Sequence, residues 1–234
     1  MSDQNTRAFI REALVSLPAK TKNKNLVGRL QQFSQSATKV KQTLSGTLEG
    51  SKRLLSVFPD AELNSLAPKV SEIKRKAKSA HRDLTGNVDV VAKTSFESKM
   101  IEMDEAAAST VKPLSDLWQK RIDEAVNPYI RLSQAVADLK LKGGGELQKH
   151  LNALQATRTR PPNSDEEALA AKDRLQALPA VIGTLGLTGR AGKFLVAVAD
   201  RNGDAKDLDD PEIRKFLDRY DLWGSLRVSL GDSK

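Results

Sequence analysis

An apolar stripe between Leu26 and Phe58 is the feature that most restricts how this chain can fold. Its positions follow in alternating steps of four and three residues, and eight of the ten are apolar: Leu26, Leu30, Phe33, Ala37, Val40, Leu44, Thr47, Ser51, Leu54 and Phe58. A helix of that length spans about 50 Å at 1.5 Å per residue. Because so narrow a stripe cannot stabilise a lone helix in water, other helices must pack against it.

The same spacing returns along the chain and predicts further helices. The stripes consist of Val70, Ile73, Ala77, Ala80 and Leu84, then Phe96, Met100, Met103 and Ala107, then Trp118, Ile122, Ala125, Tyr129, Leu132, Val136 and Leu139. A short helix is also predicted from Thr6 to Leu17, with Phe9, Ala13, Leu14 and Leu17 on one face. The chain therefore has several apolar stripes that can share one interior.

Prolines and glycines mark where these helices should end. Pro59 interrupts the first stripe, and Pro128 predicts a kink or a break inside the third long helix. The run Gly143-Gly144-Gly145 indicates the end of the long-helix region. Pro179 is expected to end a later helix.

Two capping signals and one strand signal follow. Ser164 with Glu167 forms a capping box that opens a helix, and Asp210 before Pro211 predicts another helix start. Residues 225–230 alternate polar and apolar side chains, which is the pattern of a strand. No comparable partner strand is evident, so this segment must pair with a poorly marked segment or with another chain.

These signals predict a mainly all-α fold: an elongated helical bundle or antiparallel coiled coil with a small C-terminal α(+β) module. The expected domains are a long-helix bundle at 1–142, a helical hairpin or connector at 143–179, and a helix-turn-helix-strand module at 180–234. Only 4% of the residues are aromatic and 29% are charged, which suits narrow helical stripes better than a thick globular core.

The chain holds no cysteine, which excludes disulfides, thiolate metal sites and cysteine nucleophiles. The first fifteen residues lack the continuous apolar stretch of a signal peptide. The most apolar stretch, Leu178 to Leu187, is about ten residues long, whereas a membrane-spanning helix needs about twenty. We expect a soluble, cytoplasmic protein.

Positive charge is concentrated in the first third of the chain. Between Pro18 and Arg82 there are fourteen Lys or Arg residues and only four acidic ones. The stretch from Phe96 to Ala107 carries Glu97, Glu102, Asp104 and Glu105, so part of the positive charge should be neutralised inside a bundle. The remaining basic face is either a solvated surface or a contact for nucleic-acid phosphates.

The candidate residues for nucleic-acid contact are the clustered cations. They are Lys20, Lys22, Lys24, Lys52, Arg53, Lys74, Arg75, Lys76 and Lys78, with Arg158 and Arg160 as a second group. The only aromatic side chains in the basic region, Phe33 and Phe58, belong to the apolar stripe and cannot stack on bases. Any such contact would be to the phosphate backbone, nonspecific and salt-dependent.

Signatures of catalysis, metals and cofactors fail on inspection. Asp200, Asn202 and Asp204 resemble a calcium loop, but Ala205 and Pro211 stand where the loop needs glycine and glutamate. The segment 189–193 resembles a phosphate cradle without the residues of a nucleotide-binding loop. His81 and His150 lack the helical partner that a zinc site requires. We predict no catalytic, cofactor or metal site.

The leading hypothesis is a non-enzymatic structural or adaptor subunit that self-associates or binds a larger protein. Its predicted partner contacts are Trp223, Leu226, Val228 and Leu230, since an unpaired strand can join a neighbouring sheet edge. The alternative is a nucleic-acid-associated accessory subunit of a bacterial DNA-processing or defence complex, with a winged-helix-like C-terminal module. An enzyme with an unrecognised site is a third hypothesis. A membrane-surface role is disfavoured because the stripes lack bulky aromatic side chains.

Overall fold

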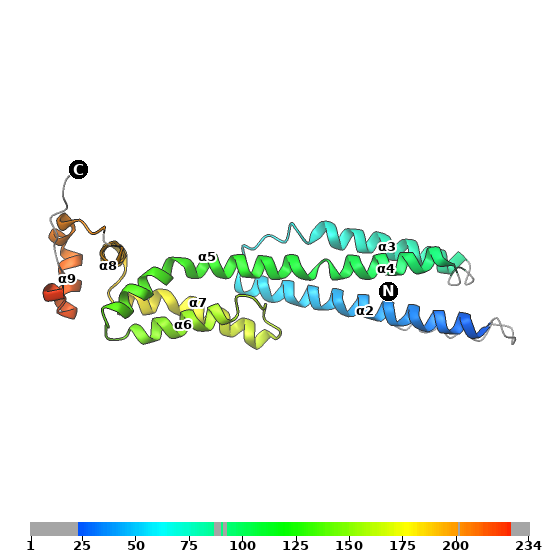
Figure 1. The fold of residues 1–234 in the computed structure, drawn as a ribbon, viewed down its shortest axis with the longest axis horizontal. Coiled ribbons are helices and arrows are strands. Elements are labelled where there is room, and N and C mark those ends of the chain that lie inside the picture. The colour runs from blue at the N-terminus through cyan, green and yellow to red at the C-terminus, as the bar shows by residue number, and fades with distance from the viewer. Residues whose placement is uncertain (1–22, 87–89, 91–92, 201, 226–234) are drawn as a thin grey trace. The chain divides into compact units, whose positions relative to one another are not determined.

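The computed structural model describes residues 23–86, 90, 93–200 and 202–225, and most of them are helical (Figure 1). The helices are α2 (Asn23–Val57), α3 (Ala67–Gly86), α4 (Thr94–Ala108), α5 (Val111–Asp138), α6 (Gly144–Ala156), α7 (Asp165–Thr184), α8 (Gly189–Ala199) and α9 (Pro211–Tyr220). Two short turns of tighter helix, η2 (Ala205–Asp209) and η3 (Trp223–Ser225), complete the order. No strand occurs among these residues, and the prediction of a mainly α-helical chain is confirmed.

The chain forms two compact units. Unit 1 holds residues up to Lys52 together with Asp60–Asp116, and unit 2 holds Arg53–Pro59 together with the chain from Leu117 onward. The chain thus passes from one unit to the other inside α2 and inside α5. The three predicted domains remain a prediction, and α7 continues across the boundary placed at residue 179.

One shared core joins α2, α3 and α4 in unit 1. It contains Leu30, Val40, Ile73, Ala80, Leu84, Phe96, Met100, Met103 and Ala107. Partly buried Phe33 packs against it, with its ring centre 5.4 Å from that of Phe96. The predicted stripes of α2 and α4 therefore face a common interior. On α3 only part of the stripe does so, because Val70 and Ala77 stay exposed.

Cross-helix pairs fix the directions of these helices. Lys39 of α2 pairs with Asp104 of α4, 65 residues later, and Thr47 of α2 pairs with Thr110, which follows α4, 63 residues later. Because this separation is nearly constant, α2 and α4 run parallel. Between α3 and α4, Lys76 meets Glu102 while the later Asp83 meets the earlier Lys99. That reversal shows that α3 and α4 run antiparallel (Figure 1).

Two polar members of the stripe are buried beside a third hydroxyl. The hydroxyl oxygens of Thr47 and Thr110 lie 2.8 Å apart, and either hydroxyl can donate to the other. The hydroxyl that accepts in this pair can donate its own proton to a backbone carbonyl, that of Thr43 for Thr47 or that of Ala107 for Thr110. Ser51 donates to the carbonyl of Thr47. These polar groups are tolerated in the interior because each has a hydrogen-bond partner.

The core of unit 2 is built on the predicted α5 stripe. Trp118, Ile122, Leu132 and Val136 are buried, as are residues from α6 and α7: Leu147, Leu151, Leu154, Ala168, Ala171, Leu178 and Ile182. The Trp118 indole N–H donates to the Thr157 carbonyl at 2.7 Å, and its ring meets Phe58 edge-on. Four of the seven predicted stripe residues of α5 are thus buried, and the other three, Ala125, Tyr129 and Leu139, are partly buried.

The prediction that Pro179 ends a helix is wrong, because α7 passes through Pro179 and ends at Thr184. At Pro128 the predicted break is absent and α5 is continuous, while Figure 1 shows α5 bending toward its C-terminal end, as the predicted kink requires. A proline removes one backbone hydrogen bond and frees the carbonyl four residues earlier. Both prolines are exposed, so water can reach that side of each helix and bond the freed carbonyl.

The predicted helix caps are present. The Ser164 hydroxyl accepts from the backbone N–H of Glu167 at 3.2 Å, and the Asp210 carboxylate accepts from that of Glu212 at 2.9 Å. Of the strand predicted at 225–230, residues 226–230 lie outside the described residues, and Ser225 ends η3. No single described helix is long and apolar enough to cross a membrane, while α7 and α8, bent by 88°, pass that test together by length and composition only.

The shared core of unit 1 predicts unequal effects for two positions on α3. Ile73 is 2% exposed, and Ile73→Ala should lower the free energy of unfolding by about 2–5 kcal/mol because it opens a cavity among three helices. Val70 is 45% exposed, so Val70→Ala should change that free energy by at most about 0.5 kcal/mol. Urea unfolding followed by circular dichroism measures both, and similar losses for the two variants would contradict this core.

Candidate functional site

Several of the predicted nucleic-acid contacts are already paired with carboxylates. Lys52 lies 2.9 Å from Glu49, and Arg53 lies 2.8 Å from Asp165. Lys76 contacts Glu102 at 2.8 Å and Glu72 at 3.5 Å. Arg158 holds both carboxylate oxygens of Asp123, at 2.5 and 2.8 Å. These cations form ion pairs within the chain, so a phosphate would have to displace an existing carboxylate partner.

The pKa values follow these pairs. The hydrogen bond from Lys76 lowers the pKa of Glu102, and the hydrogen bond to Glu102 raises the pKa of Lys76. The Arg158 guanidinium similarly lowers the pKa of Asp123. The acidic side of α4 therefore neutralises part of the basic region, through Lys76–Glu102 and Lys39–Asp104, as the sequence predicts.

Other predicted residues are not tested by the structure. Lys20 and Lys22 lie outside the described residues, as do Leu226, Val228 and Leu230, and the side chain of Lys24 is not described. Arg160 lies beside the side-chain amide of Asn163.

Among the described residues, the outer face of α3 is where predicted cations remain together and exposed. Lys74, Lys78 and Arg82 follow one another at intervals of four residues, so they lie in a row along the helix. Within the described parts of the chain, none of the three has a carboxylate at ion-pair distance. Like charges at this spacing destabilise a helix by a few tenths of a kcal/mol per pair, roughly 0.2–0.5. An anionic partner would remove that cost.

The same side of α3 also exposes apolar side chains. Val70 and Ala77 belong to the predicted stripe of α3 but are exposed. Around the helix axis they lie beside Lys74 and His81. We define these residues as the α3 outer face: Val70, Lys74, Ala77, Lys78, His81 and Arg82. Arg82 was missed as a candidate, although its spacing of four from Lys78 was a readable signal.

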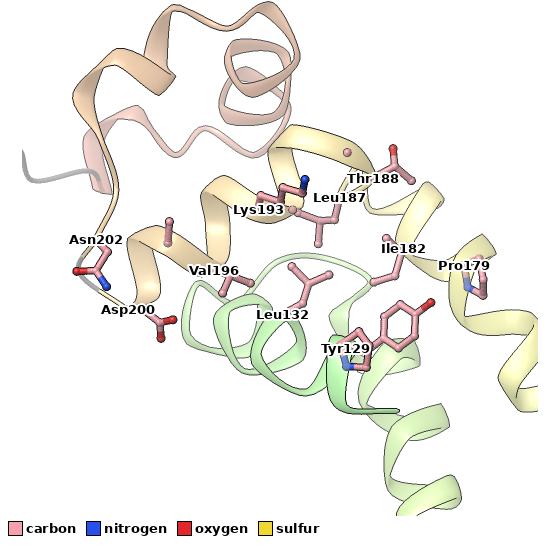
Figure 2. Close-up of a pocket in the computed structure, with 14 residues that line it drawn as sticks. Tyr129, Leu132, Pro179, Ile182, Leu187, Thr188, Lys193, Val196, Asp200 and Asn202 are labelled. Atoms are coloured by element: carbon pink, nitrogen blue, oxygen red, sulfur yellow. The ribbon is translucent and has the colours of Figure 1, made fainter. Parts of the chain in front are cut away.

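Unit 2 contains an open groove of about 690 Å³ between the end of α5, α7 and α8 (Figure 2). Leu132, Ile182 and Val196 point into it from three helices, with Tyr129 and Lys193 at its edges. The groove brings together two segments that the sequence singles out, at 189–193 and 200–204. Their polar groups are mostly occupied by other parts of the chain.

The start of α8 is the first of these segments. The backbone N–H of Ala191 donates to the Glu212 carboxylate at 3.3 Å, so a carboxylate of α9 occupies the place where a phosphate cradle would hold its anion. Gly189 has a φ of +63°, and a Cβ there would come within 2.9 Å of Glu212. The glycine at position 189 therefore allows the start of α8 to lie close to Glu212 of α9. The spacing of glycines in the sequence did not reveal this role.

The second segment lies after α8. Asp200 forms an ion pair with Arg131 at 3.1 Å, and Asp204 accepts from the backbone N–H of Lys206 to cap η2. These two carboxylates therefore stabilise the chain locally. No group of three or more His, Cys, Asp or Glu side chains is arranged to hold a metal ion within the described residues.

Trp223, a predicted partner contact, is held in place by a hydrogen bond and is still exposed. Its indole N–H donates to the Asp218 carboxylate at 2.6 Å, which fixes the ring against α9, yet 42% of the residue is exposed. The ring is held in place and still presents apolar surface.

No protein family model matches the chain, and neither a curated protein nor a solved structure matches it. The side chains described above are therefore the basis for assigning a function.

Asp210 predicts how the α8–α9 contact responds to acid. Its pKa is lowered first by the backbone N–H of Glu212 and further by Arg190, 2.7 Å away. A carboxyl whose pKa is lowered by folding stabilises the protein above its unfolded pKa, and that contribution is lost as the pH falls through the folded pKa. Asn also caps helices, so Asp210→Asn removes mainly the charge.

The unfolding free energy of this variant should lie below that of the parent at pH 6. The two values should converge as the pH is lowered below the usual aspartate range. Urea titrations at several pH values measure the difference, and a gap that persists unchanged at the lowest pH would contradict this role of Asp210.

Proposed function

We propose that the chain is a non-enzymatic adaptor subunit whose α3 outer face binds an acidic, partly apolar helix of a partner protein. The observation that carries the proposal is the mixture on that face: Val70 is 45% exposed between cations that have no ion-pair partner in the described chain. A partner helix with acidic and apolar side chains would neutralise the row and bury Val70 and Ala77 together.

The contact would also remove two unfavourable free-energy terms of unit 1: repulsion between its exposed cations and the exposure of apolar surface to water. Repulsion within the Lys74–Lys78–Arg82 row would fall when carboxylates approach it. Burial of Val70 would remove apolar surface from water, worth about 25 cal/mol per Å². The C-terminal module at 180–234 would then supply a second protein contact through the exposed ring of Trp223, since held aromatic side chains are frequent anchors of interfaces.

A second candidate is contact with a nucleic-acid backbone, as in an accessory subunit of a DNA-processing or defence complex. The row of Lys74, Lys78 and Arg82 favours it because exposed cations along a helix can follow phosphates. Val70 and Ala77 favour the protein partner instead, because a phosphate backbone offers little apolar surface to bury them.

Val70 tests the adaptor proposal against a matched position in the same unit. Val70→Asp places a charge on the α3 outer face, whereas Val111→Asp places one at another exposed valine of unit 1, which is 52% exposed. Affinity purification of the intact protein from its source cells at about 0.1 M salt, followed by mass spectrometry, compares the two. A partner recovered with the parent and with Val111→Asp should fall at least tenfold with Val70→Asp.

Loss of the partner with both variants would contradict a specific role of α3, as would equal recovery with both. Circular dichroism must show the same helicity for all three proteins.

The nucleic-acid candidate makes a different prediction. If three phosphates contact the row, changing Lys74, Lys78 and Arg82 to Gln should reduce the slope of log affinity against log salt by about 2.7 for duplex DNA, at 0.9 per phosphate. Fluorescence anisotropy with a random-sequence duplex measures the slope. Changing Lys112, Lys140 and Lys142 to Gln removes the same charge elsewhere and serves as the control. Equal slopes for both triple variants would exclude phosphate contact through α3.

A further inference from the structure

A second groove, of about 580 Å³, lies between α2 and α4 in unit 1. Its floor is apolar: the rings of Phe33 and Phe96 pack there at an interplanar angle of 50°, Met100 also lines it, and Ile101 is 54% exposed at the edge. The polar groups that line it are Arg29, Gln32, Gln35, Ser36 and Lys39 on α2, and Glu97, Asp104 and Glu105 on α4.

This groove lies on the opposite side of the α2–α4 pair from α3. Toward α3, helix α4 directs Lys99 and Glu102, and Ser109, which follows the helix as its C-cap, points the same way. The groove is lined by other α4 residues, including Glu97 and Ile101. Successive residues of a helix are rotated by about 100°, so the residues that face α3 and the residues that line the groove lie on opposite sides of the buried stripe of α4, which contains Phe96, Met103 and Ala107.

Unit 1 therefore has a place for a fourth helix. α3 covers one side of the α2–α4 seam, and no helix of the described residues covers the other side over Phe33 and Ile101. A helix lying in this groove would run antiparallel to α2 and α4, as α3 does, and would give the arrangement of a four-helix bundle.

We propose that residues 6–17 of this chain occupy the groove. They precede α2, which begins at Asn23, and lie outside the described residues. Five residues, Pro18–Lys22, separate the segment from α2, and helix connections in bundles have lengths of about two to eight residues. A connection of this length lets the segment turn back along α2.

The lengths agree. As a helix, residues 6–17 would be about 18 Å long at 1.5 Å per residue. The lining residues of α2 run from Arg29 to Lys39, which corresponds to about 15 Å along the helix axis. Folding back around Pro18–Lys22 would bring Leu17 near the start of the groove, Ala13 level with Gln32, and Phe9 level with Ser36.

The side chains of the segment also suit the groove. Phe9, Ala13 and Leu17 share one face, which would cover the apolar floor. Leu14 widens this face, and Arg7 lies at one edge of it, about 90° around the helix from the centre of the face, whereas Arg11, one turn later, lies about 130° from that centre. If the segment runs antiparallel to α2 with its apolar face against the floor of the groove, the right-handed winding of the helix places that edge on the side of α4. Arg11 would then lie level with Glu97, and Arg7 level with Ile101 and Glu105.

The covalent connection favours this occupant over a free helix. A short connection gives the segment an effective concentration in the millimolar range at the groove. The proposal concerns the side of unit 1 opposite α3, so it does not depend on the function proposed for the α3 outer face.

Engineered disulfides test the proposal in the full chain, which has no natural cysteine. Ala13→Cys is combined with Gln32→Cys or Ser36→Cys, one helical turn apart, so that a shift in register is covered. The control combines Ala13→Cys with Ser71→Cys, an exposed position on α3. At low protein concentration, at least one groove pair should form an intramolecular disulfide at least tenfold faster than the control.

A matched pair of substitutions tests whether the apolar face drives the contact. Added to the faster groove pair, Leu14→Asp should slow the cross-link to the control rate, whereas Val15→Asp, on the other face of the segment, should leave it unchanged. Disulfides that form only between chains would overturn the proposal in favour of a second copy. Groove and control pairs that react equally slowly would overturn it as well, provided that circular dichroism shows unchanged helicity.

Discussion

The contact of three apolar stripes in unit 1 is the interaction on which the rest of the structure depends. α2 is a 35-residue helix with a narrow stripe, and α3 and α4 are shorter still. None of these helices can be stable alone in water. Leu30, Ile73 and Met103 meet in one core, so each helix is ordered by the other two. This mutual dependence also decides which side chains remain at the surface for a partner.

The packing of the helices in unit 1 decides which of its cations form ion pairs. Antiparallel packing of α3 on α4 brings Lys76 to Glu102 and Lys99 to Asp83, so one flank of α3 is neutralised. The row Lys74, Lys78 and Arg82 on the outer face has no acidic helix opposite it in the described chain. The basic character of the sequence is thus divided between ion pairs that stabilise the fold and a face that can bind a partner.

Much of the fold could be predicted from the sequence because period and capping are local signals. The stripes of α2, α4 and α5 and the caps at Ser164 and Asp210 depend only on residues a few positions apart. The predicted helix end at Pro179 and the predicted break at Pro128 are absent, because the tolerance of a helix for proline depends on exposure. Glu212 at the start of α8 could not be found, because that contact joins residues 21 positions apart in a loop-rich segment. The exposure of Val70 likewise depends on how α3 is rotated against its neighbours.

Native-state hydrogen exchange tests the central claim most directly, namely that α2, α3 and α4 are stable only together. In low denaturant, the slowest amides near Leu30, Ile73 and Met103 should exchange through one common opening, with the same free energy and the same denaturant dependence. If the α3 amides lost protection at a much lower free energy while those of α2 stayed protected, the helices would not share one cooperative core and the account would be contradicted.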